Sequence, residues 1–400
     1  MILCWQGLKM MSDINTNIEI YYGPLSWFRK QVRGEEYHYL LDIINELDKE
    51  NRQFIHRIVG QKNSEEEKVR KPVRCIVAES MDFVSLQEHA IMNFFGLLRP
   101  VNPEKIILHN PPHHIHTYIE REFSNFNVEK YSYPVITESN LVEFYQDLPN
   151  NIIGQDKAKE LLSAALYPLI NRQREKPVVL MLYGPSGVGK TETAKFLSRL
   201  TGGSLMRKQF SMFQNEKFSS YIFGGSHLED SFARDLLNRE SGVILLDEFD
   251  KANSIFHSAF YQFFDDGIFE DKNYRVELGA SLVICTSNYA TEDEIRQELG
   301  DPLYSRFDAL IEFMPLSKGD LRRVVSRLVD NRYKNLNPYE QRVICRDEIK
   351  DKIYSVTANT GNIRKLDKLI EGLISLKLMR ELVSGHLSNN TTNNINSPEP

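Results

Sequence analysis

Apolar residues along the chain fall into two blocks, and in each block strand-like and helix-like patterns alternate. In the first block, Leu40, Ile44 and Leu47 lie at helical spacing among charged residues and predict an amphipathic helix over residues 36–59. The elements expected after it are strands at 73–78, 105–109 and 128–136, with helices at 84–98 and 114–124. This alternation is typical of a small α/β domain with a parallel sheet.

The second block follows residues 147–156, a segment with proline and asparagine that we interpret as a domain boundary. Its expected strands are 178–183, 204–211, 242–247, 281–286 and 309–314. Beyond Pro315 the pattern is helical to about Leu382, and the polar, Asn-rich end of the chain is typical of a disordered tail. We therefore predict four parts, at residues 1–146, 147–316, 317–385 and 386–400.

The composition favours a soluble protein of the cytoplasm. A net charge of −6 gives no overall attraction to nucleic acid or to an anionic membrane. No apolar run approaches the roughly 18 residues that a membrane-spanning helix requires, and MILCWQGLKMM lacks the basic start and the cleavage site of a signal peptide. Cys4, Cys75, Cys285 and Cys345 form no CxxC pair, which indicates reduced thiols.

A glycine-rich segment, GPSGVGKT, follows the apolar run VVLMLY and precedes a helical pattern. This is the context of a P-loop, in which backbone N–H groups surround phosphate oxygens at a helix N-terminus. We expect Lys190 to reach the β- and γ-phosphates of ATP and Thr191 to ligate Mg²⁺, the alternative being a plain glycine turn. The predicted nucleotide-binding residues of this segment are Gly184, Pro185, Ser186, Gly187, Val188, Gly189, Lys190, Thr191 and Glu192.

The run VILLDE ends in two carboxylates, as expected of a buried strand whose carboxyl end faces a ligand crevice. We expect Asp247 to hold Mg²⁺ and Glu248 to orient and activate the attacking water. Many strands end in acidic residues, so these roles are indicated mainly by the position of the run downstream of the P-loop.

From Asn151 to about Leu382 the chain resembles the C-terminal ATPase module of Clp-type protein unfoldases, which are ring-forming AAA+ ATPases. The resemblance rests on NIIGQDKAKELLSAAL, DEFDKAN, DPLYSRFDALIEFMPLSKGDLRRVV and TGNIRKLDKLI, which follow one another in the family's order. It implies an α/β fold with a five-stranded parallel P-loop sheet and a helical lid, ATP and Mg²⁺ as cofactors, and a homo-oligomeric ring, expected to be a hexamer. In this family the opening segment flanks adenine, which implies a nucleotide contact from Ile153.

The same resemblance implies roles for three further residues. Asn288 corresponds to the sensor that positions the hydrolytic water, and Arg306 to the arginine finger supplied to the neighbouring subunit's γ-phosphate. Arg364 corresponds to the second sensor, which links the lid to the nucleotide state. An Asn that ends a strand is otherwise usually a turn residue, and an Arg is usually a surface charge or an ion-pair partner.

The chain departs from this family at two loops. SSYIFGGSHLEDSF lacks several residues where the family has its aromatic substrate-gripping loop, so Tyr221 or Phe223 either substitutes for that loop or packs in the core. YATEDEIRQELGDPLYS holds no docking tripeptide of the Ile-Gly-Phe type, so we expect no partnership with the Clp peptidase.

Residues 1–146 carry no resemblance that assigns a family. His109, His113, His114 and His116 cluster near an expected helix start and are candidates for binding a metal or a phosphate, although loop histidines are usually solvated. We expect an adaptor domain that selects a client or partner protein.

Three functions remain open from the sequence. The first is ATP-driven remodelling or unfolding of a protein partner by an oligomeric ring. The second is a nucleotide-switched scaffold that controls assembly of a partner effector, for example in defence or signalling. The third is a DNA-associated motor or loader, against which the acidic composition and the absence of a basic stripe with interleaved aromatics argue.

Overall fold

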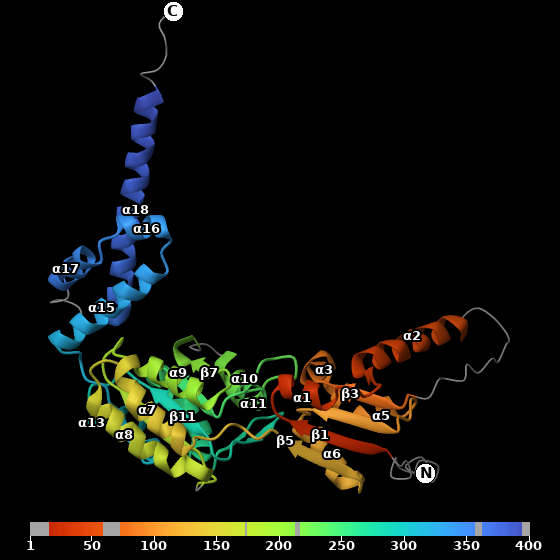
Figure 1. Cartoon of the computed structure of the whole chain (residues 1–400). Helices are drawn as coiled ribbons and strands as arrows, with labels where there is room; N and C mark the ends of the chain where they lie inside the picture. The colour runs from red at the N-terminus through yellow and green to blue at the C-terminus, as the bar shows by residue number, and fades with distance from the viewer. Residues whose placement is uncertain (1–15, 59–72, 173, 213–216, 357–361, 394–400) are drawn as a thin grey trace, which may run out of the picture.

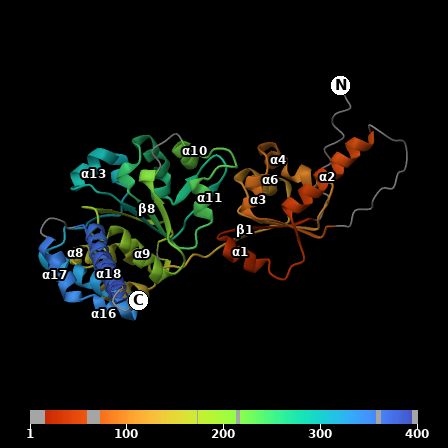
Figure 2. The same ribbon diagram turned by 90° about the horizontal axis from the view of Figure 1, so that it is seen from above.

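The computed structural model describes residues 16–58, 73–172, 174–212, 217–356 and 362–393. Along these residues the chain forms an N-terminal α/β unit, a central α/β unit and a group of helices that rises from the central unit (Figure 1). The two α/β units lie side by side (Figure 2). The expected fold class is confirmed. The residues that carry two expectations, a reduced thiol at Cys4 and the lack of a signal peptide at the start of the sequence, lie outside the described part of the chain.

The N-terminal unit is built on a five-stranded sheet with the order β2-β3-β4-β1-β5, in which all neighbours are parallel. Its strands are β1 (Asn17–Tyr22), β2 (His38–Tyr39), β3 (Cys75–Ala78), β4 (Lys105–His109) and β5 (Phe126–Lys130). Helix α1 (Leu25–Gln31) packs on one face through Phe28. Helices α2 (Leu40–Ile58) and α6 (His113–Glu122) pack on the other face through Leu40 and Ile115. Because both faces are covered, β3 is apolar and buried along its whole length, and β4 is buried from Ile106 to His109.

Three details of this unit correct the sequence-based expectation. Strand β1 was not predicted, although it pairs with both β4 and β5. The expected helix from residue 36 begins only at Leu40, because His38 and Tyr39 pair with β3. The single helix expected over 84–98 is replaced by α3 (Ser80–Ser85), α4 (Glu88–Met92) and α5 (Phe94–Leu98).

The central unit contains a second parallel sheet, with the order β12-β6-β11-β8-β7. Its strands are β6 (Val178–Tyr183), β7 (Met206–Gln209), β8 (Val243–Asp247), β11 (Leu282–Thr286) and β12 (Ala309–Glu312). Each overlaps one of the five strands expected from the sequence. Strands β6, β8 and β11 are buried along their whole length, which explains their uninterrupted apolar runs.

Helices cover both faces of the central sheet. Helices α7 (Glu138–Asn151), α8 (Asp156–Leu166) and α9 (Lys190–Thr201) pack on one face through Phe144, Leu162 and Leu197. The opposite face is covered by an aromatic-rich core. The elements of that core are α10 (Lys217–Phe223), α11 (Phe232–Leu237), α12 (Tyr261–Asp265), α13 (Glu292–Leu299), α14 (Asp301–Tyr304) and the hairpin of β9 (Ile268–Glu270) and β10 (Arg275–Glu277).

The boundary between the two α/β units lies earlier than residue 147. Helix α7 runs through residues 147–151 and packs Phe144 and Leu148 into the core of the central unit. Pro149 lies in the last turn of α7, so here a proline accompanies the end of a helix and does not separate two domains. Residues 131–137, which belong to neither helix nor strand, connect the units.

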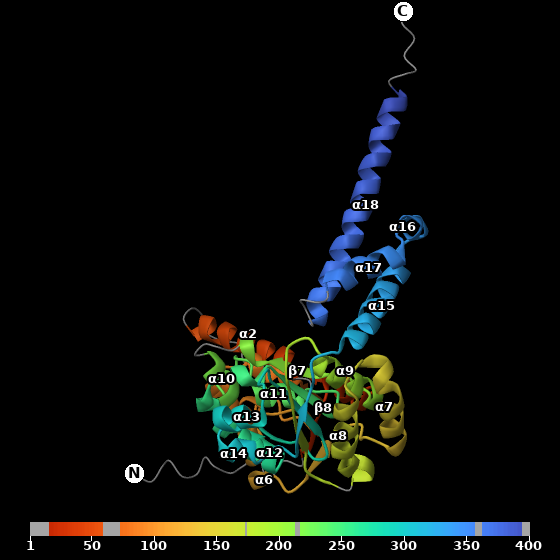
Figure 3. The same ribbon diagram turned by 90° about the vertical axis from the view of Figure 1, so that its left-hand side faces the viewer.

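The last helices form a lid with an apolar core of its own, which includes Val325, Ile349 and Leu366. These helices are α15 (Lys318–Lys334), α16 (Pro338–Val343), α17 (Arg346–Val356) and α18 (Ile363–Asn393). Helix α18 continues well beyond its neighbours (Figure 3). The expected disordered tail is therefore wrong for residues 386–393, since extending an existing helix needs no new nucleus; residues 394–400 lie outside the described part. None of the described helices is both long and apolar enough to cross a membrane.

Candidate nucleotide-binding site

The glycine-rich turn connects the end of β6 to the start of α9 in the central unit. Gly184 and Gly187 adopt φ angles of 122° and 78°, which side chains other than glycine rarely adopt. A Cβ atom on Gly184 would lie 2.2 Å from the carbonyl oxygen of Phe313. The sequence GPSGVGKT therefore forms the turn that the P-loop pattern predicts, directly before the N-terminus of a helix.

Lys190 is buried beneath this turn. Its Nζ donates to the carbonyl oxygens of Gly184 at 2.6 Å and Pro185 at 2.8 Å, and lies 3.5 Å from Oδ1 of Asn288. Burial lowers the pKa of Lys190 to about 8, and the positive charge of Arg364 acts in the same direction. The ammonium group is thus positioned among acceptors, and it holds its proton less tightly than an exposed lysine does.

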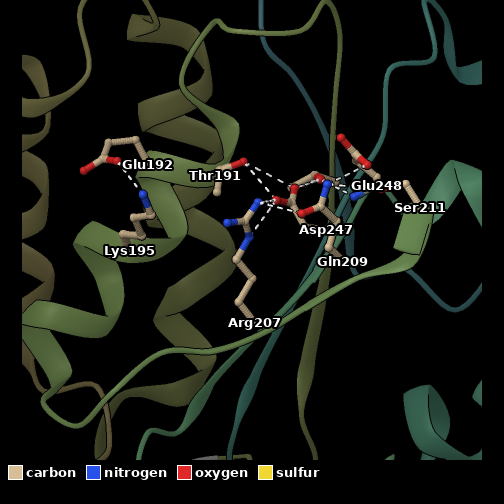
Figure 4. Close-up of polar contacts among 9 residues, drawn as sticks. Thr191, Glu192, Lys195, Arg207, Gln209, Ser211, Asp247 and Glu248 are labelled. Carbon is tan, nitrogen blue, oxygen red and sulfur yellow. Dashed lines mark hydrogen bonds and ion pairs between the residues drawn. The ribbon is translucent and has the colours of Figure 1, made fainter. Parts of the chain in front are cut away.

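The carboxylate of Asp247 is buried at the end of β8 and faces α9 (Figure 4). The hydroxyl of Thr191 donates to it, with Oγ1 at 3.3 Å from Oδ1, and the hydroxyl of Thr286 donates to the same oxygen. The guanidinium of Arg207 approaches from β7, with Nε 2.9 Å from Oδ2 of Asp247. Two hydroxyls and one cation therefore hold this carboxylate in a single orientation.

Glu248 follows Asp247 and is one of three non-glycine residues with positive φ among those the structure describes. Its φ of 56° turns the side chain out of the strand direction, and its backbone N–H donates to Oγ1 of Thr286 at 3.0 Å. The side-chain amide of Gln209 donates to Oε2 of Glu248 at 3.0 Å (Figure 4). Left-handed backbone at a non-glycine residue is costly and is found disproportionately at functional sites.

Arg207 and Gln209 were not predicted from the sequence. Both lie on β7, and Gln209 is paired in register with Asp247 of β8. The available signal was the pair of polar residues in the expected strand at 204–211. Polar residues in a strand indicate a site only when the neighbouring strand is known, and here β7 lies beside β8, which carries Asp247.

A cavity of about 670 Å³ joins these groups, a volume within the range of small-molecule sites. Gly184 and Pro185 do not line it and contact Lys190 instead. The predicted residues that line it are Ile153, Ser186, Gly187, Val188, Gly189, Lys190, Thr191, Glu192, Asp247, Glu248, Asn288 and Arg364.

The lid forms the roof of the cavity. Nδ2 of Asn362 donates to Oγ of Ser186 at 3.1 Å, and the N–H of Ile363 donates to the carbonyl of Gly187 at 3.2 Å. Ile152 packs in the core of the central unit, whereas its neighbour Ile153 packs in the core of the lid. A ligand in the cavity would therefore contact the central unit and the lid at once.

Arg306 does not line the cavity of its own chain. Its Nε lies 2.7 Å from Oδ2 of Asp265, and its guanidinium lies 4.7 Å from the ring centre of Tyr261. The structure thus brings all the other predicted catalytic and metal-binding residues together and leaves Arg306 apart from them.

The oxygen ligands and the lysine in the cavity fit a magnesium–nucleotide complex. The Thr191 hydroxyl and the Asp247 carboxylate supply hard oxygen ligands, and Mg²⁺ bound with nucleotide usually needs only one or two from the protein. Lys190 donates to backbone carbonyls, which phosphate oxygens can replace as acceptors. Larger metal clusters are not found: in the described residues no three His, Cys, Asp or Glu side chains lie close enough to share an ion.

The histidines of the N-terminal unit accordingly occupy different environments. His109 is fully buried and its ring stacks on Phe28, with the ring centres 4.6 Å apart. His116 contacts the hydroxyl of Tyr22 through Nδ1 at 2.5 Å. His113 and His114 are exposed on the first turn of α6.

The two aromatic residues considered as a substrate grip also differ. Tyr221 is buried and donates its hydroxyl to Asp235 at 2.6 Å, so it belongs to the core. Phe223 is 41% exposed, with its ring centre 5.9 Å from that of Phe256. Of this pair, Phe223 alone presents a large part of its ring at the surface.

Comparisons with known proteins agree with this geometry. Residues 175–312 match the family described as AAA domain (Cdc48 subfamily). The chaperone protein ClpB of Clostridium perfringens is 25% identical over 292 residues, which cover 62% of this chain and 32% of ClpB. The ATP-dependent Clp protease ATP-binding subunit ClpE of Streptococcus pneumoniae is 28% identical over 253 residues, covering 54% of this chain and 33% of ClpE. This chain thus spans about a third of the length of these relatives.

A structural comparison supports the same fold. The closed-state cryo-EM structure of Hsp104 with ATPγS and FITC casein superimposes with a TM-score of 0.54 at 15% identity, covering 93% of this chain and 89% of that chain. The fold and the cavity define a P-loop module of the AAA+ ATPase class. Together with the ClpB and ClpE matches, they support a Clp-family AAA+ ATPase module that covers part of the chain, as the sequence resemblance predicted.

Proposed function

We propose that this chain binds ATP with Mg²⁺ in the cavity above the glycine-rich turn and hydrolyses it. The observation that carries the proposal is the convergence of Lys190, Thr191, Asp247 and Glu248 at one end of the sheet. Phosphoryl transfer requires little covalent chemistry from a protein and depends on positioning and charge neutralisation. This set of side chains offers both.

Each residue has a defined task in this proposal. Lys190 neutralises the β- and γ-phosphate oxygens, while Thr191 and Asp247 hold the Mg²⁺ that offsets charge on the same phosphates. Glu248, held by Gln209, orients the attacking water and accepts its proton. Asn288, 3.5 Å from Lys190, positions the water from beyond the carboxyl end of β11, the strand beside β8. Ile153 contacts the base, and Arg364 senses the phosphates from the lid.

Completion of the site requires a second copy of the chain. Arg306 does not line its own cavity, and an arginine finger supplied in trans typically contributes about 10³ to 10⁵ in rate. We therefore propose that copies assemble head to tail, so that Arg306 of one subunit approaches the γ-phosphate bound by the next. Such heterologous contacts close into a ring, and the family resemblance implies six subunits.

The work done by hydrolysis is proposed to be remodelling of a protein. The support is the similarity to ClpB and ClpE and the exposed Phe223, which we propose contacts the client. The N-terminal unit then selects the client. No partnership with the Clp peptidase is proposed, because the docking tripeptide is missing from the loop after Asn288.

A second candidate is a nucleotide-switched scaffold that controls an effector protein. The observation in its favour is the burial of Tyr221, which leaves a single candidate aromatic for gripping substrate. The two candidates differ in one experiment. ATP-dependent loss of structure in a tagged client, abolished by Phe223→Ala, supports remodelling, whereas ATP-dependent assembly without any client effect supports the scaffold.

The test of ATP hydrolysis uses Glu248→Gln and Lys190→Ala. Glu248→Gln should bind Mg-ATP normally and lose turnover by about 10² to 10⁴, because the amide cannot accept a proton. Lys190→Ala should lose binding itself. Glu298→Gln on the exposed face of α13 is the matched control and should behave as wild type. Full hydrolysis by Glu248→Gln would refute the assignment.

A further inference from the structure

A second cavity, of about 600 Å³, lies where the N-terminal unit meets the central unit. One wall comes from the N-terminal unit and the linker, with Tyr22, His116 and Tyr131. The other wall comes from the central unit, with Arg239 after α11 and Arg275 on β10. It shares no lining residue with the ATP cavity.

The N-terminal wall has the location at which parallel sheets bind ligands. After β1 the chain passes to α1 on one face of the sheet, and after the neighbouring β4 it passes to α6 on the other face. Crevices at the carboxyl ends of two strands with such divergent connections are the usual ligand sites of open α/β sheets. Tyr22 and Gly23, at the end of β1, and Pro111 and His113, which follow β4, line the cavity.

Arg239 is the least satisfied charge in this cavity. It is 4% exposed, and its Nη1 and Nη2 donate to the carbonyls of Leu236 at 2.6 Å and Leu278 at 3.4 Å. Its Nε is a buried donor without an acceptor, and within the described part of the chain no carboxylate forms an ion pair with it. Burying a cation without a countercharge is expensive, so an anion supplied from outside the chain would stabilise it.

The other charges in the cavity also leave a positive excess. Lys130 pairs with Glu277 at 3.0 Å, and Arg275 approaches the same carboxylate at 3.8 Å. Glu277 is therefore shared by two cations, while the nearest carboxylate to His116 is Glu120 at 3.3 Å. Arg275 also pairs with Glu270 at 3.5 Å, but Glu270 does not line the cavity. Among the lining side chains, the cations of Lys130, Arg239 and Arg275 therefore outnumber the carboxylates of Glu120 and Glu277.

Aromatic rings accompany the charges. Tyr22 stacks on His116 with ring centres 5.6 Å apart, and Tyr131 contacts Tyr133 edge to face at 4.9 Å. The guanidinium of Arg239 lies 3.8 Å from the ring centre of Tyr133. Planar rings and guanidinium planes of this kind stack on nucleobases, while Arg and Lys bind phosphates.

We propose that this cavity is a second ligand site that binds a mononucleotide, with the phosphate near Arg239 and Arg275 and the base among the tyrosines. Such a ligand would contact both units at once. The units already touch around the cavity, since the N–H of His113 donates to the carbonyl of Asn273 at 2.8 Å and Asn110 donates to Asn238 at 3.2 Å. Binding would therefore fix the N-terminal unit on the ATPase module.

The experiment uses the full chain carrying Lys190→Ala, which removes nucleotide binding at the glycine-rich turn. AMP, GMP, CMP and UMP are titrated by calorimetry, and ribose 5-phosphate and inorganic phosphate serve as probes without a base. At least one mononucleotide should bind with one-to-one stoichiometry. Trp27 fluorescence should change as well, because its ring centre lies 5.5 Å from that of Tyr131.

Arg275→Gln, at a partly exposed position that should not disturb folding, should weaken this binding by about tenfold or more, as should Arg239→Gln. Arg296→Gln, an exposed arginine on α13, is the matched control and should leave it unchanged. The proposal is overturned if no mononucleotide binds more tightly than about 1 mM, or if Arg275→Gln has no effect. If inorganic phosphate binds as tightly as the mononucleotides, the cavity does not recognise the base and that part of the proposal is overturned.

Discussion

Arg207 forms an ion pair with Asp247, the carboxylate that also accepts a hydrogen bond from Thr191. The Arg207 side chain is 37% exposed, whereas that of Asp247 is 5% exposed. A guanidinium in contact with a carboxylate lowers the attraction of that carboxylate for a metal ion, both by charge repulsion and by occupying its oxygens. Arg207 is therefore placed to compete with Mg²⁺ in the proposed site.

Arg207→Gln should let Mg²⁺ act at lower concentration. Removal of the competing charge should lower the Mg²⁺ concentration for half-maximal ATP hydrolysis by about threefold to tenfold. The measurement is a Mg²⁺ titration of hydrolysis at saturating ATP. Arg296→Gln is the control, because that arginine pairs with Asp301 on the surface. A requirement for more Mg²⁺ would instead mean that Arg207 chiefly orients Asp247.

The position of Arg306 predicts complementation between two inactive variants. Arg306→Ala lacks the finger and Lys190→Ala lacks nucleotide binding, so each should hydrolyse ATP at least about 10³-fold more slowly than wild type. A mixture should regain activity, because Arg306 of a Lys190→Ala subunit can complete the site of an Arg306→Ala neighbour. Hydrolysis is measured across mixing ratios and should be highest when both variants are present.

Two controls make this result specific. Mixing Arg306→Ala with a chain that carries both changes should restore nothing, since no subunit then supplies a finger. Size-exclusion chromatography with light scattering should show assembly in every mixture. If Arg306→Ala alone hydrolyses ATP at the wild-type rate, Arg306 does not act on the neighbouring subunit's site.

The central unit was predictable because its signals are local. Strands β6 and β8 are buried on both faces, so their apolar runs end at the residues that carry the chemistry, Lys190 after the glycine turn and Asp247 at the strand end. Backbone constraint adds to this, since Gly184 has no room for a side chain. Such features can be recognised within one short segment.

The features that were missed depend on residues distant in sequence. Strand β1 is six residues long, and its polar Glu19 alternates with buried Ile18 and Ile20. Its place inside the sheet comes from pairing with β4 and β5. Arg207 and Asn362 are polar residues whose importance comes from the partners Asp247 and Ser186. No local sequence pattern predicts those contacts.

The lowered pKa of Lys190 predicts that ATP affinity depends on pH. Burial brings this pKa to about 8, whereas bound phosphate favours the charged ammonium. Binding above pH 8 must therefore take up a proton, and the dissociation constant should rise by about tenfold for each pH unit above that value. Calorimetry at pH 8.5 in two buffers with different ionisation enthalpies measures the proton uptake.

Lys190→Arg serves as the comparison for this prediction. A guanidinium stays charged across the range, so any nucleotide affinity that this variant retains should not change between pH 7 and 9.5. An affinity of the wild type that is equally flat, without proton uptake, would show that Lys190 is charged before ATP binds.

His109 predicts acid sensitivity of the N-terminal unit. Its ring is buried on Phe28, and burial lowers its pKa from 6.5 to about 4, an effect that the nearby Glu79 carboxylate only partly opposes. Between these two pH values the His109 imidazole is protonated in the unfolded chain but remains neutral in the folded unit. Stability is therefore fully present above about pH 6.5 and falls as the pH drops toward 4, by about 3 kcal/mol in total.

His109→Gln should remove most of this dependence, although it lowers stability at pH 7 through lost packing. Urea unfolding at several pH values between 7 and 4.5, followed by tryptophan fluorescence, measures it. Of the two tryptophans, Trp27 lies in α1 and reports the N-terminal unit, while Trp5 precedes the described residues. His89→Gln, at an exposed histidine, should keep the wild-type slope. If His109→Gln retains that slope as well, the acid sensitivity belongs to other groups, because the buried imidazole is the one that this variant removes.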